Sequence, residues 1–553
     1  MEYLLLITLI LMSMFHLNSF ASNLINEKSY FKVNSTALKQ ARKAFMAFDT
    51  SNLQDPPMPP KSFSVYHLDL FEKSKFKDYD SVFKNRLSQD NASATYLSSM
   101  LKSHNSAKNV LDDQILKVTP TMYLRGHYVA TFLLGSEKIH NLLLIDTGNY
   151  FTWWQCAPCI EDKCYKPQFC TIYNYTTSNT YRSLDCVTNS STCITTTSDF
   201  HCSLETKSCF YVHVYDNGET TKGFVASDII TFPSDNTQAR INFGCSVDQK
   251  SGSDFSGTFS GIVGLSKKLS AKTTGGYSLP SQLGSSLFAL CLPSSKSTQP
   301  SILTFNKAPW IYGTEAKFVK NRLNPHLYYV NLYKIFINDK EVPVDPSWWS
   351  GKKDDHGAMV DTGSLITRFP HDLYIVFRYI FREEMKYPML QYPIGIFDTC
   401  YKEEENEDMY FPIIRFYFGS VSHKQELMLV QDRVVADLQG FYCLAFLPWD
   451  DKTTLIGSHQ LQGTGLTFDF KNNALTFSVD AYFVEYFVKW MEYKSHSFLH
   501  LDRVSAINIC AYIGPVRTQA TVTECVKDKE LGIGKGLMGI WAGFGGKLDW
   551  VCN

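Results

Sequence analysis

Two copies of the tripeptide Asp-Thr-Gly, each at the end of an apolar run, constrain this chain more than any other feature of its sequence. The first copy ends the run at residues 142–145 with Asp146, and the second ends the run at residues 358–360 with Asp361. An apolar run that stops at a glycine turn is typical of a buried strand. Because the copies lie about a domain length apart, they predict two related lobes that each contribute one carboxylate to a shared site.

A pair of aspartates in one site can supply both an acid and a base. Two carboxyl groups within hydrogen-bonding distance cannot both ionise at low cost, so they share a proton and their titration steps move apart. At mildly acid pH the ionised member can take a proton from a water molecule that attacks a peptide carbonyl, while the protonated member hydrogen-bonds the carbonyl oxygen. Asp146 and Asp361 are therefore the predicted catalytic residues, and we predict no metal ion and no other cofactor.

The residues around the two motifs form a longer pattern. After Asp146-Thr147-Gly148 the chain reads Asn-Tyr-Phe-Thr-Trp-Trp-Gln-Cys-Ala-Pro-Cys and enters a cysteine-rich insert, and further matching segments follow at 243–245, 261–265, 288–292, 361–367, 397–401 and 455–457. In this order the segments resemble the pepsin-like aspartic proteases, and more closely their plant nepenthesin-like branch. The resemblance implies a mainly β, bilobal fold with two six-stranded-type β-barrel lobes and a cleft between them.

The chain divides into five predicted parts. Residues 1–21 are expected to be a secretory signal peptide, since a short apolar run is followed by small residues at 19 and 21. An uncleaved membrane anchor is the alternative, although the run is shorter than the roughly 20 residues that a span needs. The remaining parts are a prosegment at 22–117, an N-terminal lobe at 118–310 with its cysteine-rich insert at 156–209, a C-terminal lobe at 311–485, and a tail of unknown role at 486–553.

The expected prosegment contains an alternating, strand-like run at 62–68 and a polar stretch with helical spacing at 78–104. In the family, such segments cover the cleft with basic residues that pair with the aspartates at neutral pH and separate from them in acid. The resemblance therefore implies that the chain's own prosegment is a partner of its cleft. Lys84, Arg86 and Lys102 are the candidates for this pairing, with solvated surface positions as the alternative for each.

The resemblance also assigns supporting roles beside the aspartates. The threonines of the triplets are expected to bond across to the other lobe, the glycines to let the backbone turn close behind the carboxylates, and the next residue to hydrogen-bond the carboxylate. These residues are Thr147, Gly148, Asn149, Thr362, Gly363 and Ser364. Asn149 departs from the family, which usually has serine or threonine there, but its amide can also donate a hydrogen bond.

A second group of residues is expected to contact the substrate. Tyr215 falls on the tyrosine of the family's flap, a hairpin that closes over the peptide. Asp216 replaces the glycine that usually follows this tyrosine, although Asn217-Gly218 still forms a competent hairpin turn. Trp153 falls where the family has a tryptophan near the flap, and a core tryptophan is the alternative.

The chain has 15 cysteines, and eight of them lie between residues 156 and 209. Behind a signal peptide this density favours disulfide bonds over a zinc site. Family spacing implies five pairs, which are Cys156 with Cys159, Cys164 with Cys245, Cys186 with Cys209, Cys193 with Cys202, and Cys400 with Cys443. Four Asn-x-Ser/Thr sequons add candidate glycosylation sites at Asn34, Asn91, Asn174 and Asn189.

Composition limits the partners of the protein. The 553 residues carry a formal net charge of −1, so neither nucleic acid nor an anionic membrane surface is an expected partner. The hydrophobic content of 44% supports sizeable cores, and 31 Tyr and 39 Phe fit a β-rich protein. We expect a monomer without a membrane span after signal removal, located outside the cell, as in the cell wall, or in the vacuole, and acting on polypeptides.

Together these features predict an aspartic endopeptidase that hydrolyses peptide bonds at acid pH. The alternative is a catalytically impaired pepsin-like protein that binds or inhibits another secreted protein, as the plant xylanase-inhibitor relatives do. Asn149 and Asp216 favour this alternative, whereas the retention of both aspartates opposes it. The second Asp-Thr-Gly in the same chain argues against a third arrangement, a homodimer in which each copy supplies one aspartate.

Overall fold

The computed structural model describes residues 30–106 and 127–479 except for short gaps. These gaps are residue 54 and residues 56–57, 161–162, 165–170, 188–192, 194–199, 204, 215–219, 251–257, 268–276, 311–312, 322–324, 345–356, 405–407 and 421–422. The expected signal peptide, the whole expected tail, the flap residues Tyr215 and Asp216, and the sequon at Asn189 therefore lie outside the described residues.

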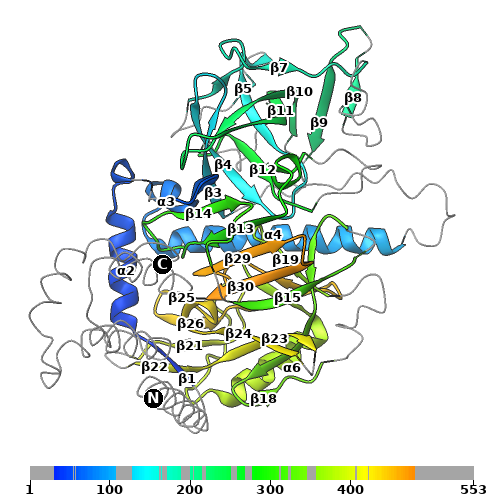
Figure 1. Ribbon diagram of the computed structural model, residues 1–553. Helices are drawn as coiled ribbons and strands as arrows, with labels where there is room; N and C mark the ends of the chain where they lie inside the picture. The colour runs from blue at the N-terminus through cyan, green and yellow to red at the C-terminus, as the bar shows by residue number, and fades with distance from the viewer. Residues whose placement is uncertain are drawn as a thin grey trace, which may run out of the picture.

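The fold is mainly β and bilobal, as expected from the sequence. Figure 1 shows one group of strands in the upper part of the molecule and a second group below it, with further strands between them. The upper lobe is built from β3 (Tyr128–Leu134), β4 (Ile139–Asp146), β5 (Trp153–Ala157), β6 (Tyr173–Asn174), β7 (Arg182–Ser183), β8 (Phe200–Cys202), β9 (Cys209–Val214), β10 (Thr220–Thr231), β11 (Gln238–Lys250) and β12 (Gly261–Gly264).

In the described residues, the lower lobe combines five strands of the large barrel sheet with three smaller sheets and one amphipathic helix. Its elements are β16 (Tyr328–Val330), β17 (Leu332–Ile337), β18 (Lys340–Glu341), β19 (Ala358–Val360), β20 (Thr367–Pro370), α6 (His371–Glu384), β21 (Cys400–Lys402), β22 (Met409–Pro412), β23 (Ile414–Ser420), β24 (His423–Leu429), η7 (Gln431–Arg433), β25 (Val435–Leu438), β26 (Phe441–Leu444), β27 (Phe446–Trp449) and β28 (Thr454–Ile456). Helix α6 buries Leu373, Phe377 and Phe381, which share one face at spacings of four residues.

A central group of strands joins the two lobes. It contains β2 (Ser62–His67), the short helix α5 (Leu279–Gln282), β13 (Leu287–Leu292), β14 (Ser301–Phe305), β15 (Thr314–Val319), β29 (Thr464–Asp469) and β30 (Ala474–Val479). Strand β13 pairs with both β14 and β29, and β2 pairs with both β14 and β3. The strand expected at 62–68 is thus a fully buried member of this sheet.

The N-terminal segment continues with helices that pack on both lobes. Its other elements are β1 (Tyr30–Val33), α2 (Ser35–Ala47), η2 (Thr50–Asn52), α3 (Asp69–Glu72), η3 (Lys73–Lys75) and α4 (Tyr79–Ser106). Helix α4 crosses the molecule in Figure 1, and its apolar side chains Tyr79, Phe83 and Leu87 share a core cluster with residues of both lobes.

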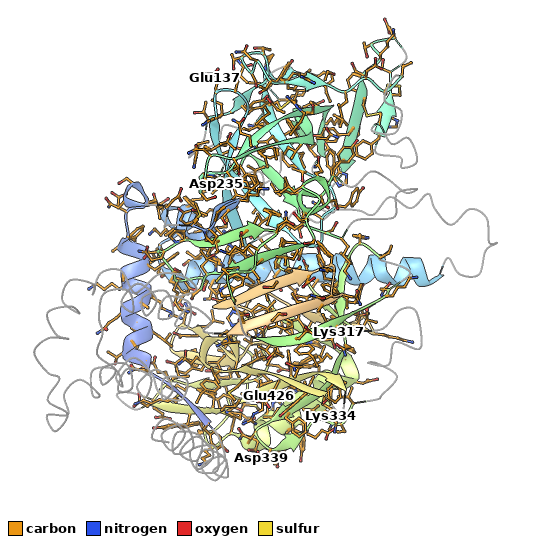
Figure 2. The ribbon with its side chains drawn as sticks, viewed as in Figure 1. Glu137, Asp235, Lys317, Lys334, Asp339 and Glu426 are labelled. Atoms are coloured by element: carbon orange, nitrogen blue, oxygen red, sulfur yellow. A yellow bond between two sulfur atoms is a disulfide. The ribbon has the colours of Figure 1, made fainter. Side chains whose placement is uncertain are left out.

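Charged side chains are distributed over the surface of both lobes. Figure 2 labels Glu137 and Asp235 on the upper lobe and Lys317, Lys334, Asp339 and Glu426 on the lower lobe. Three of these take part in surface ion pairs, which are Lys317 with Glu315 at 2.7 Å, Lys334 with Glu341 at 2.8 Å and Glu426 with Arg415 at 3.3 Å. Such exposed pairs contribute little stability, because solvent screens them.

The disulfide bonds correct most of the expected pairings. Cys400 pairs with Cys443 as expected, but the other bonds are Cys156–Cys245, Cys159–Cys164, Cys186–Cys202 and Cys193–Cys209. The expected pairs Cys156–Cys159, Cys164–Cys245, Cys186–Cys209 and Cys193–Cys202 are therefore wrong.

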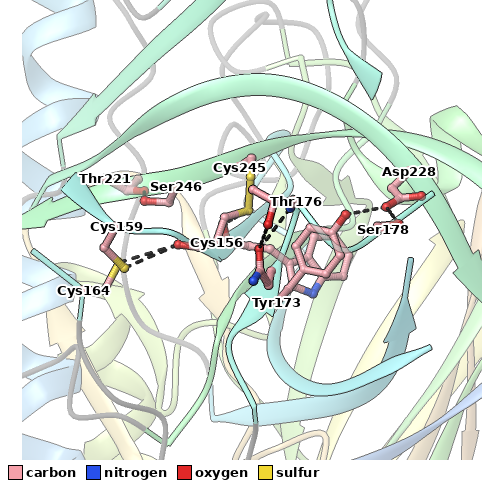
Figure 3. Close-up of a disulfide and its surroundings, with 12 residues drawn as sticks. Cys156, Cys159, Cys164, Tyr173, Thr176, Ser178, Thr221, Asp228, Cys245 and Ser246 are labelled. Atoms are coloured by element: carbon pink, nitrogen blue, oxygen red, sulfur yellow. Dashed lines mark hydrogen bonds between the residues drawn. A yellow bond between two sulfur atoms is a disulfide. The ribbon is translucent and has the colours of Figure 1, made fainter. Parts of the chain in front are cut away.

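Strand register explains the corrected pairs. Cys156 lies on β5 beside parallel β11, where Cys245 is opposite Trp154, so the Cα atoms of Cys156 and Cys245 are only 5.4 Å apart (Figure 3). Cys159 and Cys164 then remain to pair in the following loop. In the insert, Cys202 and Cys209 are directly opposite each other on β8 and β9. Cys186 and Cys193 can therefore each reach either of them, and the structure pairs Cys186 with Cys202 and Cys193 with Cys209.

Three of the four sequons lie on described residues. Asn34 and Asn91 are exposed, at the start of α2 and on α4. Asn174 is half-buried, and its side-chain oxygen accepts a hydrogen bond from Thr176 N at 3.0 Å. Asn34 and Asn91 are therefore the more accessible candidates.

Candidate active site

The same local arrangement delivers both aspartates. Strand β4 ends at Asp146, and β19 ends at Val360, one residue before Asp361. A parallel strand lies beside each of them, β12 beside β4 and β28 beside β19. Each neighbouring strand leads to a glycine that packs closely against the aspartate loop. A Cβ on Gly264 would lie 2.5 Å from Asn149 O, and a Cβ on Gly457 would lie 2.5 Å from Leu365 O, so no larger residue fits at either position.

The two carboxyl groups meet behind the first glycine turn. A Cβ placed on Gly148 would lie 3.2 Å from Asp146 Oδ1 and 3.4 Å from Asp361 Oδ1, so one carboxylate oxygen of each aspartate lies beside the same glycine. Gly148 N donates to Asp146 Oδ1 at 2.8 Å, and Gly363 N donates to Asp361 Oδ1 at 3.0 Å. The structure thus brings together the two aspartates and both glycines that the sequence singled out.

The two triplets are joined by reciprocal threonine hydrogen bonds. Thr362 N donates to Thr147 Oγ1 at 3.1 Å, Thr147 N donates to Thr362 Oγ1 at 3.4 Å, and the two hydroxyl oxygens are 3.2 Å apart. Both threonines are fully buried. Because each loop supplies the partner of the other, neither can shift without leaving a buried polar group unpaired.

The electrostatics of the two carboxyls are unequal. Burial, followed by the negative charge of Asp361, raises the pKa of Asp146 well above its usual range. Burial also raises the pKa of Asp361, but hydrogen bonds from Ser364 and Gly363 oppose that increase. Ser364 Oγ donates to Asp361 Oδ2 at 2.7 Å. Asp361 accepts hydrogen bonds from Ser364 and Gly363, whereas Asp146 accepts one from Gly148, so the charge is favoured on Asp361 and the shared proton on Asp146.

Asn149 does not support its carboxylate in the expected way. Its Oδ1 accepts a hydrogen bond from Phe151 N at 2.8 Å, which closes a turn within its own loop. Its Nδ2 is buried and has no hydrogen-bond partner among the described residues. The expected amide donation to Asp146 is therefore absent, because the turn fixes the side chain against the backbone that follows.

Trp153 lies in the protein core. It is fully buried on β5, as is its neighbour Trp154, and the two side chains belong to different core clusters. Alternation along the strand explains this division, because consecutive side chains point to opposite faces. The burial of Trp153 agrees with the core alternative, and its expected place near the flap stays a prediction, because residues 215–219 lie outside the described part of the chain.

The N-terminal helix α4 reaches the loop that follows Asp361. Asp90 Oδ1 accepts a hydrogen bond from Leu365 N at 2.7 Å, and Asp90 Oδ2 lies 2.8 Å from an Arg368 guanidinium nitrogen. Asp90 is 2% exposed, and its negative charge adds to the causes that raise the pKa of Asp361. Sequence reasoning missed Asp90, although Phe83, Leu87, Asp90 and Ala94 share the spacing of one helix face.

The basic residues expected to reach the aspartates lie elsewhere. Lys84 Nζ donates to Gln439 Oε1 at 2.7 Å. Arg86 Nε donates to Asp69 Oδ1 at 2.5 Å, and its guanidinium also pairs with Glu72. The side chain of Lys102 is outside the described set. Lys84 and Arg86 thus anchor α4 to the protein surface and to α3, because nearer acceptors than the aspartate pair are available to them.

No metal-binding cluster occurs in the part of the chain that the structure describes, where no three or more His, Cys, Asp or Glu side chains gather suitably. Within the same residues, no helix is both long and apolar enough to cross a membrane.

Comparisons with known proteins agree with this geometry. Residues 128–306 match the family model described as xylanase inhibitor N-terminal, and residues 327–479 match the model described as xylanase inhibitor C-terminal. Aspartyl protease AED1 of Arabidopsis thaliana is 28% identical over 369 residues, which cover 64% of this chain and 71% of that protein. Aspartic proteinase nepenthesin-2 of Nepenthes gracilis is 26% identical over 366 residues, which cover 65% of this chain and 78% of that protein.

A solved structure shows the likeness in fold alone. The crystal structure of edgp has 19% sequence identity and a TM-score of 0.51, and the match covers 66% of this chain and 93% of that one.

Proposed function

Because the chain belongs to the plant nepenthesin-like branch of the pepsin-like aspartic proteases, we propose that it is an aspartic endopeptidase that hydrolyses peptide bonds at acid pH. The observation that carries this proposal is the meeting of two carboxyl groups around Gly148, with pKa values raised by burial. Such a pair holds one shared proton at mildly acid pH, which is the state that the reaction requires.

The unequal hydrogen bonds support different roles for the two aspartates in this proposal. Asp361, whose charged form is favoured by Ser364 and Gly363, acts as the base that takes a proton from a bound water molecule. The water oxygen attacks the peptide carbonyl carbon, while protonated Asp146 donates its proton to the carbonyl oxygen and yields a neutral tetrahedral intermediate. A proton then passes from Asp361 to the peptide nitrogen, the carbon–nitrogen bond breaks, and Asp146 recovers its proton from the departing acid.

The substrates in this proposal are polypeptides bound in extended form, with bulky apolar side chains beside the cut. Residues 22–117 act as a prosegment, and α4 is the part of it that lies beside the aspartate pair. The five disulfide bonds among described cysteines support a protein that folds in an oxidising compartment, and we place it in the cell wall space or the vacuole, as a monomer that carries a signal peptide and glycans.

A cleavage assay tests the proposal. The full chain is incubated at pH 3 to 5 until its N-terminal segment is removed, and an unfolded protein is then added with and without a pepstatin-type inhibitor. We expect cleavage that the inhibitor blocks and that an Asp361→Asn variant, processed by an added protease, lacks. If the processed wild-type protein shows no inhibitor-sensitive cleavage, the enzymatic function is rejected.

The second candidate is a protein that binds or inhibits another secreted protein. Asn149 favours it, because its side chain does not bond Asp146, which accepts no side-chain hydrogen bond from the described residues. This candidate predicts a folded, processed chain that forms a stable complex with a partner and cleaves nothing at any pH between 3 and 7.

A further inference from the structure

Arg368 is a buried cation with an incomplete set of partners. It lies on β20, it is 3% exposed, and its Nε has no hydrogen-bond partner among the described residues. The carboxylate of Asp90 faces it at 2.8 Å, and the same carboxylate accepts a hydrogen bond from Leu365 N. An arginine fork together with a backbone N–H is a donor set suited to a carboxylate.

These donors belong to the loop that carries Asp361. Ser364, which bonds the carboxylate of Asp361, directly precedes Leu365, and Arg368 follows on the strand that this loop enters. Asp90 bonds Leu365 N, and the residue before it, Ser364, bonds Asp361, so the carboxylate of Asp90 lies close to the aspartate pair. A ligand in this position therefore lies beside the reacting groups.

Asp90, which fills this position, belongs to the expected prosegment at 22–117, which is cleaved off in the proposed function. Once α4 leaves, Arg368 and Leu365 N keep their places on the lower lobe but lose their only described carboxylate partner. A guanidinium and a backbone N–H that have lost their carboxylate partner can bind another carboxylate through charge-assisted hydrogen bonds, which a neutral group cannot match.

We propose that Arg368 and the backbone N–H of Leu365 form a carboxylate-binding subsite beside the aspartate pair, filled here by Asp90 and filled in the processed enzyme by an acidic side chain of the substrate. The binding of a substrate carboxylate in the processed enzyme rests on the proposed function, whereas the subsite filled by Asp90 does not. Asp90 thus acts as an internal substitute for a glutamate or aspartate of the bound polypeptide.

Chemical rescue in the full chain tests the subsite without catalysis. Asp90→Ala removes the carboxylate and leaves a space that formate, a carboxylate of the same size, can fill. Thermal unfolding is measured at pH 6 in sodium formate and in sodium chloride of equal ionic strength. We expect the variant to unfold at a lower temperature than the wild type in chloride and to recover part of that loss in formate.

Matched variants isolate the arginine. In Asp90→Ala/Arg368→Met both charges are absent, so formate should have the same effect as chloride. Asp80→Ala removes an acidic residue from the same helix, one that pairs instead with Arg42, and should also show no formate effect. Equal unfolding temperatures of Asp90→Ala in the two salts would overturn the subsite.

Paired peptides test its use by substrate. The acid-processed protein is given peptide libraries that differ only by Glu or Gln at each position around the cut, and kcat/KM is compared at pH 5. At one position we expect the Glu peptide to be preferred by about tenfold or more, since a charge-assisted hydrogen bond is lost with Gln. The preference should fall below about pH 4 as glutamate becomes protonated, and Arg368→Met should abolish it.

The outcomes separate the two proposals. Equal kcat/KM for the Glu and Gln peptides at every position would overturn the proposal that the subsite binds an acidic side chain of the substrate. Complete absence of cleavage would overturn the proposed function, whereas the formate measurement would still decide on the subsite.

Discussion

At the scale of single residues, the central feature is the inequality of the two aspartates. The sequence presents them as equivalent ends of two similar motifs, but Ser364 supports Asp361 whereas Asn149 turns away from Asp146. The difference follows from side-chain length, because serine reaches the carboxylate while the asparagine oxygen is held by Phe151 N. The lower lobe therefore holds the carboxyl that ionises more readily.

Ser364→Ala tests this inequality. Loss of the hydroxyl raises the pKa of Asp361, because the hydrogen bond that lowers it is removed. A base with a raised pKa is protonated at a higher pH, so the acid limb of the kcat/KM profile should move to higher pH. We expect activity at pH 3 to fall by roughly tenfold. Ser364→Thr keeps the hydroxyl and should keep the profile, and an unmoved acid limb in the alanine variant would contradict this role.

At the scale of secondary structure elements, α4 is fixed at two points by buried ion pairs. Asp90 binds the lower lobe, and Arg86 binds Asp69 and Glu72 of α3. Burial alone would raise the pKa of Glu72, but Arg86 and Lys75 lower it to about 2. A lowered carboxylate pKa stabilises the folded state above the ordinary pKa, and this stabilisation is lost as pH falls towards the lowered value. The anchor at Glu72 should therefore persist at pH 3 to 5.

Arg86→Met tests this anchor. The substitution leaves Asp69 without its guanidinium and Glu72 with Lys75 alone, which should lower the free energy of unfolding by about 3–5 kcal/mol. Hydrogen exchange of α4 should accelerate in parallel. Lys84→Ala on the same helix removes only an exposed contact with Gln439 and should change stability by less than about 0.5 kcal/mol. Equal stability of the two variants would show that Arg86 does not hold α4.

Local sequence patterns predicted where the strands and helices lie better than they predicted the contacts between them. The apolar runs before each Asp-Thr-Gly, the strand at 62–68 and the helix after Asp78 all follow from spacing along the chain, and the structure has β4, β19, β2 and α4 at these places. The disulfide between Cys156 and Cys245 depends on the register of β5 and β11, which sequence spacing does not encode. The position of Asp90 similarly depends on how α4 docks.

At the scale of the whole molecule, the N-terminal segment is part of the sheet that joins the lobes. All six residues of β2 are buried, and the strand is hydrogen-bonded to β3 on one side and β14 on the other. The expected prosegment at 22–117 therefore includes a structural strand as well as α4. Its removal leaves one edge of β3 and one edge of β14 without their partner.

A chain that begins at residue 118 tests the contribution of this segment. Loss of the buried side chains Phe63, Val65 and Tyr66 alone should lower the free energy of unfolding by roughly 5 kcal/mol or more. The measurement is thermal unfolding of the shortened chain beside the full chain. A mixture with the separately made segment 22–117 should recover stability. An unfolding temperature equal to that of the full chain would contradict the structural role of β2.

The pH dependence of kcat/KM between pH 2 and 8 tests the paired aspartates most directly. For the processed wild-type protein we predict a bell-shaped profile with its maximum at acid pH, because one carboxyl must be ionised and the other protonated. Asp146→Asn and Asp361→Asn should each remove activity across the whole range. A rate that keeps rising towards pH 8, or an Asp361→Asn variant that cleaves as fast as the wild type, would contradict the account.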